Sequence, residues 1–292
     1  MSEYTFNPAK SENFAIHHTT YTDTNIFLRF DWGERIAGTQ NTVQENGFFV
    51  YRRDQLIGGI AMLDNRIRCP FLVPPFDDRV AFWMGVLAHA RETRGEGKIE
   101  LDEIPQTDAD ALFSLGAQVR WSQRRMCRPT QVLDIKTDDG IVLVSPAEED
   151  LPEIASVAHQ AHCAGYAAAV WGAPDIAVTQ REIARRFEAF SQTSTWDMSV
   201  VAKCTDTHEI VGVCIAGIYP DSADNFSTIH QVSVLPQYQR RGIAAAMMGY
   251  SISAAHRVSP VITLGVLIGN PAEHLYRKLG FAPGPSYNNL IY

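Results

Sequence analysis

The stretch QYQRRGIAAAMM, residues 237–248, places two arginines and a single glycine directly before a run of small and apolar residues. It follows STIHQVSVLP, residues 227–236, whose apolar and β-branched residues predict a strand that ends at Pro236. The residues that follow predict a helix from about Arg241 to His256. The amides of a first helical turn lack intrahelical partners, and the positive end of the helix dipole points out of the same turn. The sequence therefore predicts a strand, a turn and a helix start that can hold a phosphate.

The glycine pattern of this stretch limits what kind of phosphate site it can be. Gly242 would let a ligand approach the backbone, and Ala244 to Ala246 keep the first helical turn narrow. The stretch lacks the second glycine and the Gly-Lys-Ser/Thr of a Walker loop, and it lacks the three glycines of the dinucleotide fingerprint. Taken alone, it fits an exposed helix start with two solvated arginines equally well.

The composition is that of a globular protein of one or two domains, with 292 residues of which 46% are hydrophobic and 20% charged. A net charge of −8 without a lysine or arginine tract argues against nucleic-acid binding. The five cysteines show no C-x-x-C spacing, which argues against a disulfide framework and predicts no metal site. The sequence shows no signal peptide and no apolar run of about 20 residues, so we expect a cytoplasmic protein that does not bind membranes.

Several segments of the first half have counterparts in the second half. The hairpin-like residues 48–63 resemble residues 199–218, and the strand-and-helix patterns that follow them recur in the same order. Residues that punctuate both halves recur 154, 162 and 164 positions apart, namely Gly58 with Gly212, Pro74 with Pro236, and Gly116 with Gly280. This repeat predicts two similar mixed α/β units over residues 1–135 and 141–292. The alternative is a loose likeness between any two α/β stretches.

Two motifs of the second unit resemble those of the GNAT superfamily of acyl-CoA-dependent N-acyltransferases. VLPQYQRRGIA, residues 234–244, resembles that family's V-x-P-x-Y-[QR]-x-x-G-x-[GA] element. VLIGNPAEHLYRKLGF, residues 266–281, resembles the family's strand, Asn, helix, Tyr and Leu-Gly-Phe ending. The resemblance implies two tandem GNAT-like units of mixed α/β class, each with a mostly antiparallel, twisted sheet flanked by helices. It reaches the first unit only through the internal repeat.

The same resemblance implies a binding site for acetyl-CoA as a co-substrate. The pyrophosphate of acetyl-CoA would lie on the backbone of the turn and helix start, formed by Gln239, Arg240, Arg241, Gly242, Ile243 and Ala244. Val232 and Val234 would offer backbone groups of a splayed strand to the pantetheine arm and the thioester carbonyl. Asn270 matches the family's cofactor-contacting Asn, and Tyr276 matches its usual general acid.

The general base is open at the level of sequence. His230 lies four residues before Val234, where many members that use a base carry an acidic residue. A histidine titrates near neutrality and could accept the proton of the amine, although a partly exposed strand histidine is an equal alternative. His159, His162 and Trp171 are weaker candidates for lining the acceptor pocket.

The first unit lacks the chemistry of the second. At an offset of 162 residues, three positions of the first unit carry a different kind of residue. Asp77 corresponds to Gln239, Asp78 to Arg240, and Val80 to Gly242. Two carboxylates would repel a pyrophosphate, and a β-branched side chain would block its approach to the backbone. At an offset of 164, Leu112 takes the place of Tyr276. We therefore expect the first unit to be a degenerate, non-catalytic copy.

The sequence thus favours an N-acetyltransferase that transfers an acetyl group to the amine of a small molecule or of an exposed protein residue by direct attack on the thioester. A catalytically silent CoA-binding regulatory module is the alternative. A structural interaction protein would need neither of the two motifs.

Overall fold

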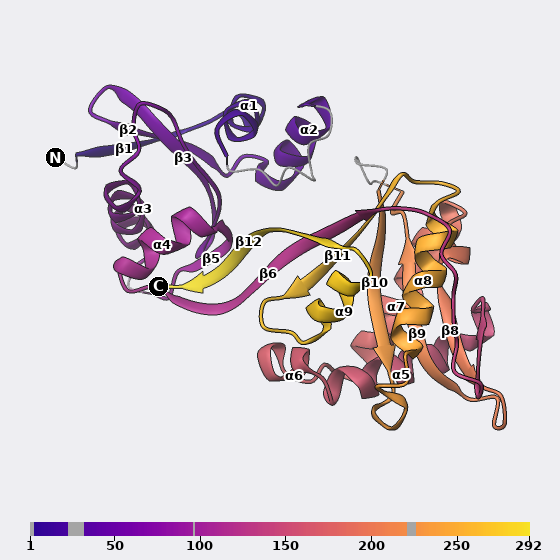
Figure 1. Ribbon diagram of the computed structural model, residues 1–292. Coiled ribbons are helices and arrows are strands. Elements are labelled where there is room, and N and C mark those ends of the chain that lie inside the picture. Colours follow the sequence, from indigo (N-terminus) through magenta and orange to yellow (C-terminus); the bar gives the residue numbers. More distant parts are fainter. Residues whose placement is uncertain (1–2, 23–31, 96, 221–225) are drawn as a thin grey trace. The chain divides into compact units, whose positions relative to one another are not determined.

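The computed structural model describes residues 3–22, 32–95, 97–220 and 226–292 (Figure 1). The chain divides into two compact units. Unit 1 comprises Met1–Arg124 together with Gly284–Tyr292, and unit 2 comprises Arg125–Pro283. The chain therefore returns to unit 1 for its last residues.

The elements of unit 1 follow one another in the order β, α, α, β, β, β, α, β, α. They are β1 (Tyr4–Pro8), α1 (Ser11–Tyr21), α2 (Trp32–Val43), β2 (Gly47–Arg52), β3 (Gln55–Leu63), β4 (Arg66–Leu72), α3 (Arg79–Arg94), β5 (Glu100–Pro105) and α4 (Gln106–Ser114). The next strand, β6 (Gln118–Pro129), begins in unit 1 and ends in unit 2.

Unit 2 repeats this order and adds one short helix, α6. Its elements are β7 (Ile141–Val144), α5 (Leu151–Cys163), α6 (Tyr166–Trp171), α7 (Ile176–Gln192), β8 (Val200–Cys204), β9 (Ile210–Gly217), β10 (Ser227–Val234), α8 (Ile243–Ala255), β11 (Val261–Leu267) and α9 (Ala272–Lys278), followed by β12 (Ala282–Ile291). Short 3-10 turns lie at Glu148–Asp150, Trp196–Met198 and Pro236–Tyr238. The repeat includes β1 and α1, whose sequences do not align clearly with those of β7 and α5.

Both sheets are mixed and mostly antiparallel, as the resemblance implied. In unit 1 the strands lie in the order β1-β2-β3-β4-β5-β12, and in unit 2 in the order β6-β11-β10-β9-β8-β7. The described pairs are antiparallel except for β4 with β5 and β10 with β11. The fold class predicted from the sequence is therefore confirmed.

The two repeats exchange their last strands. β12, which follows the second repeat, pairs with β5 of unit 1, with Tyr287 opposite Pro105 and Ile291 opposite Glu100 (Figure 1). β6, which follows the first repeat, lies next to β11 of unit 2. The predicted boundaries, which end the first unit at 135 and give 141–292 to the second, differ from this arrangement. The sequence predicts a last strand near YNNLIY, residues 287–292, but it carries no signal for which of two similar sheets will accept this strand.

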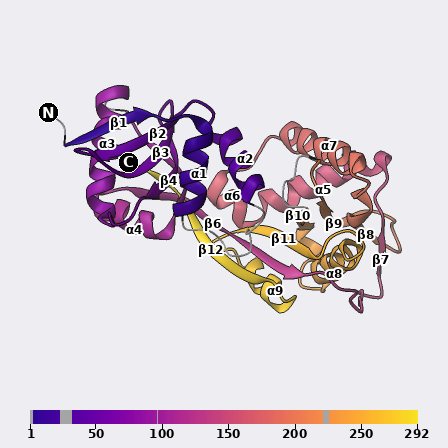
Figure 2. The ribbon, with the colours of Figure 1, turned by 90° about the horizontal axis from the view of Figure 1, so that it is seen from above.

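Helices cover both faces of the sheet in unit 2 (Figures 1 and 2). Alternate residues of β8 and β9 point to opposite faces, so Val200 and the opposing Cys214 pack with α8 in one buried cluster. Val201 and Val213 pack with α5 and α7 in another buried cluster. Within the described residues, no helix combines the length and the apolar character that crossing a membrane requires.

One side chain of β12 ties this strand to unit 1. The buried Asn288 side chain donates from Nδ2 to the Ile104 carbonyl at 3.3 Å and to Gln106 Oε1 at 3.2 Å, and it accepts from Ser122 Oγ at 2.6 Å. Removing the amide deletes these hydrogen bonds from a buried position, and a buried group left unsatisfied costs about 1–3 kcal/mol.

We therefore expect Asn288→Ala to destabilise unit 1 selectively. Hydrogen exchange should become faster at the amides of β5 and stay unchanged at those of β8 and β9. Pro285→Ala, at an exposed position of the same strand, is the control and should leave both unchanged. Faster exchange in β8 and β9 with β5 unaffected would contradict the assignment of β12 to unit 1.

Candidate functional site

The site begins where the parallel pairing of β10 with β11 stops. The register covers Ser227–Ile229 opposite Ile262–Leu264, although β10 continues to Val234 and β11 to Leu267. Beyond Ile229, the edge of β10 that faces β11 is therefore not covered by strand pairing. This geometry matches the splayed strand that the resemblance implied.

The backbone amides of Val232 and Val234 point into this gap. The amide of Leu235 donates to the Val211 carbonyl of β9 at 2.9 Å. Successive amides of a strand point to opposite sides, so the N–H of Val234, and two residues earlier that of Val232, point away from β9. Both groups are available to a ligand that lies between β10 and β11.

His230 is the extra residue of a β-bulge. The pairing of β10 with β9 shifts between Ile229, opposite Ala216, and Gln231, opposite Ile215. A bulge bends its strand and changes the direction of the bulged side chain, and such bulges are frequent next to active sites. The His230 ring packs against Phe190 and Tyr219, with centroid distances of 5.4 and 4.9 Å.

The environment of His230 keeps its ring neutral. Burial, together with the positive charges of Arg186, Arg125 and Arg185, lowers its pKa to about 3. Nε2 of His230 is buried and has no hydrogen-bond partner among the described residues. The side chain is therefore an uncharged group with a free ring nitrogen, which differs from the near-neutral titration expected from the sequence.

The loop from residue 235 to residue 242 ends in a glycine that the backbone geometry requires. Gly242 is the N-cap of α8 with a φ of 82°, in the left-handed region that favours glycine. A Cβ built at this position would meet no protein atom within 4 Å, so the space beside Gly242 is open. The first hydrogen bond of the helix runs from the Ala246 amide to the Gly242 carbonyl at 3.0 Å. The amides of residues 243–245 precede that bond and have no intrahelical partner.

These groups border a cleft of about 570 Å³ between the start of α8 and the start of α9. Its lining includes six residues that the sequence analysis named, which are Val234, Gln239, Arg240, Gly242, Ile243 and Ala244. It also includes seven that the sequence analysis did not assign to the site, which are Tyr238, Ala245, Pro271, Ala272, His274, Leu275 and Lys278. Arg240 and Lys278 are cations, and none of these lining residues is acidic. The cleft therefore suits an anionic ligand.

A second hollow of about 540 Å³ adjoins the cleft and shares Ala245 and Lys278 with it. Its other lining residues include the cations Arg128 and Lys136 and the apolar Leu133 and Ile135. Together the two hollows offer more room than a phosphate alone needs.

Arg241 faces away from the cleft. Its guanidinium donates to both carboxylate oxygens of Asp138, from Nη2 at 2.7 Å and from Nε at 3.0 Å, and it lies over the Tyr238 ring at 5.5 Å. The hydrogen bonds from Arg241 and from the Gly140 amide lower the pKa of Asp138 to about 2. The charge of Arg241 is thus neutralised within the protein, and its side chain is not among those that line the cleft.

Asn270 and Tyr276 lie beside the cleft without lining it. Asn270 Oδ1 accepts from the Ala272 amide at 2.9 Å, which holds the start of α9. Tyr276 is half-buried against the core cluster that contains α8. Burial, followed by the nearby Cys214, raises the pKa of Tyr276 to about 12, so its hydroxyl stays protonated across the pH range of ordinary assays.

The weaker candidates lie around α5 and α6. His162 Nε2 is 3.3 Å from the Gly172 carbonyl, and His159 Nε2 is 3.6 Å from Cys163 Sγ. Trp171 is 52% exposed. Neither histidine, nor Trp171, is among the residues that line the cleft. Across the part of the chain that the structure describes, no group of three or more His, Cys, Asp and Glu side chains could hold a metal ion.

The corresponding loop of unit 1 is shorter and is closed by its own side chain. Six residues, 73–78, connect β4 to α3, whereas eight residues, 235–242, connect β10 to α8. The structural counterpart of the N-cap Gly242 is therefore the N-cap Asp78, and the predicted match of Gly242 with Val80 is wrong. A carboxylate oxygen of Asp78 accepts from the Ala81 amide at 2.9 Å. The start of α3 is therefore already occupied by the carboxylate of Asp78.

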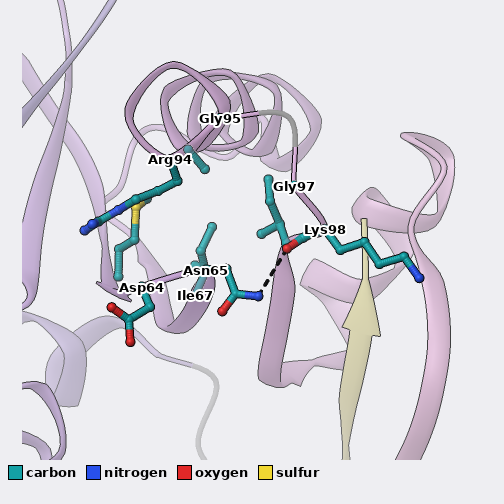
Figure 3. Close-up of a pocket in the computed structure, with 10 residues that line it drawn as sticks. Asp64, Asn65, Ile67, Arg94, Gly95, Gly97 and Lys98 are labelled. Carbon is teal, nitrogen blue, oxygen red and sulfur yellow. Dashed lines mark hydrogen bonds between the residues drawn. The ribbon is translucent and has the colours of Figure 1, made fainter.

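Two further observations set unit 1 apart. Leu112, the counterpart of Tyr276, is fully buried and carries no polar group. A small cavity, of about 30 Å³, lies between the end of α3 and the β3–β4 hairpin, next to the hydrogen bond from Asn65 Nδ2 to the Lys98 carbonyl (Figure 3). It has room for about one water molecule and not for a nucleotide.

One protein family matches part of the chain, and several solved structures match its whole fold. A family model described as an acetyltransferase (GNAT) domain matches residues 196–283. That range runs from the turn before β8 to the start of β12, so it includes the splayed strand, the loop and both helices of the cleft. None of the curated proteins compared with the chain matches it.

Solved structures match over the full length of the chain at low sequence identity. A GCN5-related N-acetyltransferase from Sphaerobacter thermophilus has a TM-score of 0.70 at 14% identity, covering 100% of this chain and 96% of that one. An acetyltransferase of the GNAT family from Colwellia psychrerythraea has a TM-score of 0.60 at 12% identity, with 98% of each chain covered. A tandem GNAT protein from the clavulanic acid biosynthesis pathway has a TM-score of 0.57 at 12% identity, covering 99% of this chain and 98% of that one.

The family match in unit 2 and the full-length fold matches agree with the motifs and with the repeated order of elements. Residues 196–283 therefore match a GNAT acetyltransferase domain, and the whole chain has the fold of the tandem GNAT proteins.

Proposed function

We propose that the protein is an acetyl-CoA-dependent N-acetyltransferase whose unit 2 binds acetyl-CoA and catalyses the transfer. The observation that carries this proposal is the cleft at the start of α8, where a left-handed Gly242 leaves open space beside unpaired amides. Phosphate groups bind at helix starts of this kind because both the free N–H groups and the dipole favour an anion.

Acetyl-CoA fits the groups that line and border this cleft. The amides of residues 243–245 would hold the pyrophosphate, with the side chains of Arg240 and Lys278 adding positive charge. The amides of Val232 and Val234 would bind the pantetheine arm and the thioester oxygen. Acetyl-CoA supplies the acetyl group as a thioester, and its transfer to an amine breaks one C–S bond, forms one C–N bond and moves one proton from nitrogen to sulfur.

Three groups of the chain serve this transfer. The N–H of Val234 faces the gap, where it can donate to the oxygen that gains negative charge. The Tyr276 hydroxyl remains protonated and can donate to the departing sulfur. The neutral His230 ring offers a free Nε2 to the proton of the amine.

We infer that unit 1 is a non-catalytic copy. Asp78 occupies the start of α3 with its own carboxylate, and Leu112 replaces the hydroxyl-bearing Tyr276. A second anion placed at α3 would meet the negative charge of Asp78 and the neighbouring Asp77.

Gly242→Val should abolish binding of acetyl-CoA. A β-branched residue is strained at a φ of 82°, and its side chain would fill the open space where the pyrophosphate lies. In calorimetric titrations we expect affinity to fall at least about 100-fold, which corresponds to about 2.7 kcal/mol.

Gly172→Val is the matched control for backbone strain in the same unit. Gly172 has a φ of 80° and equally open surroundings, but it lies outside the cleft. We expect this control to keep the wild-type affinity. Equal affinity of wild type and Gly242→Val would remove the cleft as the acetyl-CoA site.

Tyr276→Phe should reduce turnover far more than binding. Removing a positioned proton donor costs about 100-fold or more in kcat, while the affinity for acetyl-CoA should change less than about twofold. Because the pKa of Tyr276 is about 12, the wild-type rate should show no loss from ionisation of this phenol up to about pH 10.

The measurement is thiol release from acetyl-CoA with a panel of small amines, over that pH range. Tyr250→Phe, which loses a hydroxyl of the same core cluster, is the control and should retain wild-type turnover. An unchanged rate in Tyr276→Phe would exclude this residue as the proton donor. Tight binding without turnover of any amine would favour a CoA-binding regulatory module.

A further inference from the structure

Two buried nitrogens near the bulge of β10 have no hydrogen-bond partner among the described residues, Nε2 of His230 and Nε of Arg186. Buried polar atoms of proteins are normally satisfied, so each marks a position where a partner from outside the chain fits. The two groups lie on the same side of the sheet. His230 packs against Phe190 of α7, and Arg186 precedes Phe190 by one turn on the same helix face.

The position of α7 at this place is set by a glycine. A Cβ at Gly217, at the end of β9, would collide with the ring of the fully buried Phe190. Glycine therefore lets α7 approach the sheet beside the bulge, where its side chains can reach a molecule bound near His230.

Arg185 belongs to the same group of side chains through Tyr219. The Arg185 guanidinium carbon lies 5.6 Å from the centre of the Tyr219 ring, and its Nη2 donates to the Tyr219 hydroxyl at 3.4 Å. The Tyr219 ring also contacts the rings of His230, at 4.9 Å and nearly perpendicular, and of Phe190, at 5.1 Å. A side chain on α7 is thus connected to the bulge by one aromatic ring.

The charge around His230 is unbalanced. Arg125, in the second half of β6, is the third guanidinium whose field reaches His230. The ion pairs found for this group among the described residues involve a single carboxylate, that of Glu182, at 3.0 Å from Arg185 and 3.6 Å from Arg186. We name Arg125, Arg185 and Arg186 the basic cluster, in which three positive charges face one negative charge.

We propose that the basic cluster binds a carboxylate of the acceptor, so that the amine acetylated by this protein is an amino-acid-like molecule. This inference rests on the acetyltransferase function proposed above, since it places the acceptor amine at His230. A guanidinium presents Nε and Nη as a planar fork that matches the two oxygens of a carboxylate. Arg186 has this fork available, because its Nε is unpartnered and its ion pair with Glu182 is long.

An acceptor carboxylate in the basic cluster would also change the state of His230. Its negative charge would offset the guanidinium charges that help to lower the pKa of His230, whereas the effect of burial would remain. The pKa of His230 would therefore rise toward its ordinary value when the acceptor is bound. The ring nitrogen would accept a proton from the amine more readily with this acceptor than without it.

The test compares matched acceptors on Arg186→Gln and on a control variant. The pairs are glycine with glycinamide, and phosphoethanolamine with ethanolamine, each measured as kcat/KM with acetyl-CoA. We expect wild type to prefer glycine over glycinamide by at least about tenfold, and Arg186→Gln to remove that preference mainly through KM. Arg181→Gln, exposed on the same helix, should behave as wild type. Arg186→Lys, which keeps the charge but loses the fork, should restore part of the preference.

A binding measurement separates this inference from the proposed function. N-acetylglycine is titrated calorimetrically into each variant with CoA present, and we expect affinity to fall about tenfold in Arg186→Gln and not in Arg181→Gln. Arg186-dependent binding without turnover of any amine would reject the acetyltransferase function and keep the carboxylate site.

If amines without a carboxylate are acetylated and the substitutions of Arg186 do not change their rates, the acetyltransferase function stands and the carboxylate site is overturned. A preference for phosphoethanolamine alone would overturn the carboxylate in favour of a phosphate.

Discussion

The site depends on a parallel strand pairing that stops after three residues. β10 and β11 pair over their first residues and then separate. Where they separate, the amides of Val232 and Val234 face a gap. The bulge at His230 lies at the same point of β10, so the partner-free ring nitrogen and the open edge of the strand result from one irregularity. The loop that follows then only has to turn the chain by way of Gly242 to bring the free amides of α8 to the end of this gap.

The two units share a fold but differ at the helix start that we propose binds an anion in unit 2. Both have a strand, a turn and a helix in the same order, but they differ in whether the chain itself satisfies the first amides of the helix. In unit 1 a loop two residues shorter places Asp78 at the N-cap, where its carboxylate takes the position that an external anion would need. In unit 2 the N-cap is a glycine with open space around it. The shorter loop and the change of the N-cap from glycine to aspartate therefore distinguish the two helix starts.

The repeat, the hairpins and a helix that begins within two residues of its observed start at residue 243 could be predicted from the sequence, because each follows from local patterns of apolar residues, glycines and prolines. Three other features could not be predicted from the sequence. The exchange of β6 and β12 depends on which of two similar sheets accepts a strand, and no local pattern records that choice. The sequence does not show that Asp78 corresponds to Gly242. The loop of unit 2 is two residues longer, so the offset between Pro74 and Pro236 no longer holds at the helix start. The neutral state of His230 depends first on its burial and then on arginines far away in sequence, on α7 and β6.

The central claim is that one site per chain, at the start of α8, binds acetyl-CoA. Hydrogen exchange of the intact protein with and without acetyl-CoA tests it most directly, because the free amides of residues 243–245 and those at the start of α3 can be followed in the same sample. The account predicts slower exchange at residues 243–245 when acetyl-CoA is present, with no change at residues 79–81. Protection at residues 79–81, or at neither helix start, would contradict it.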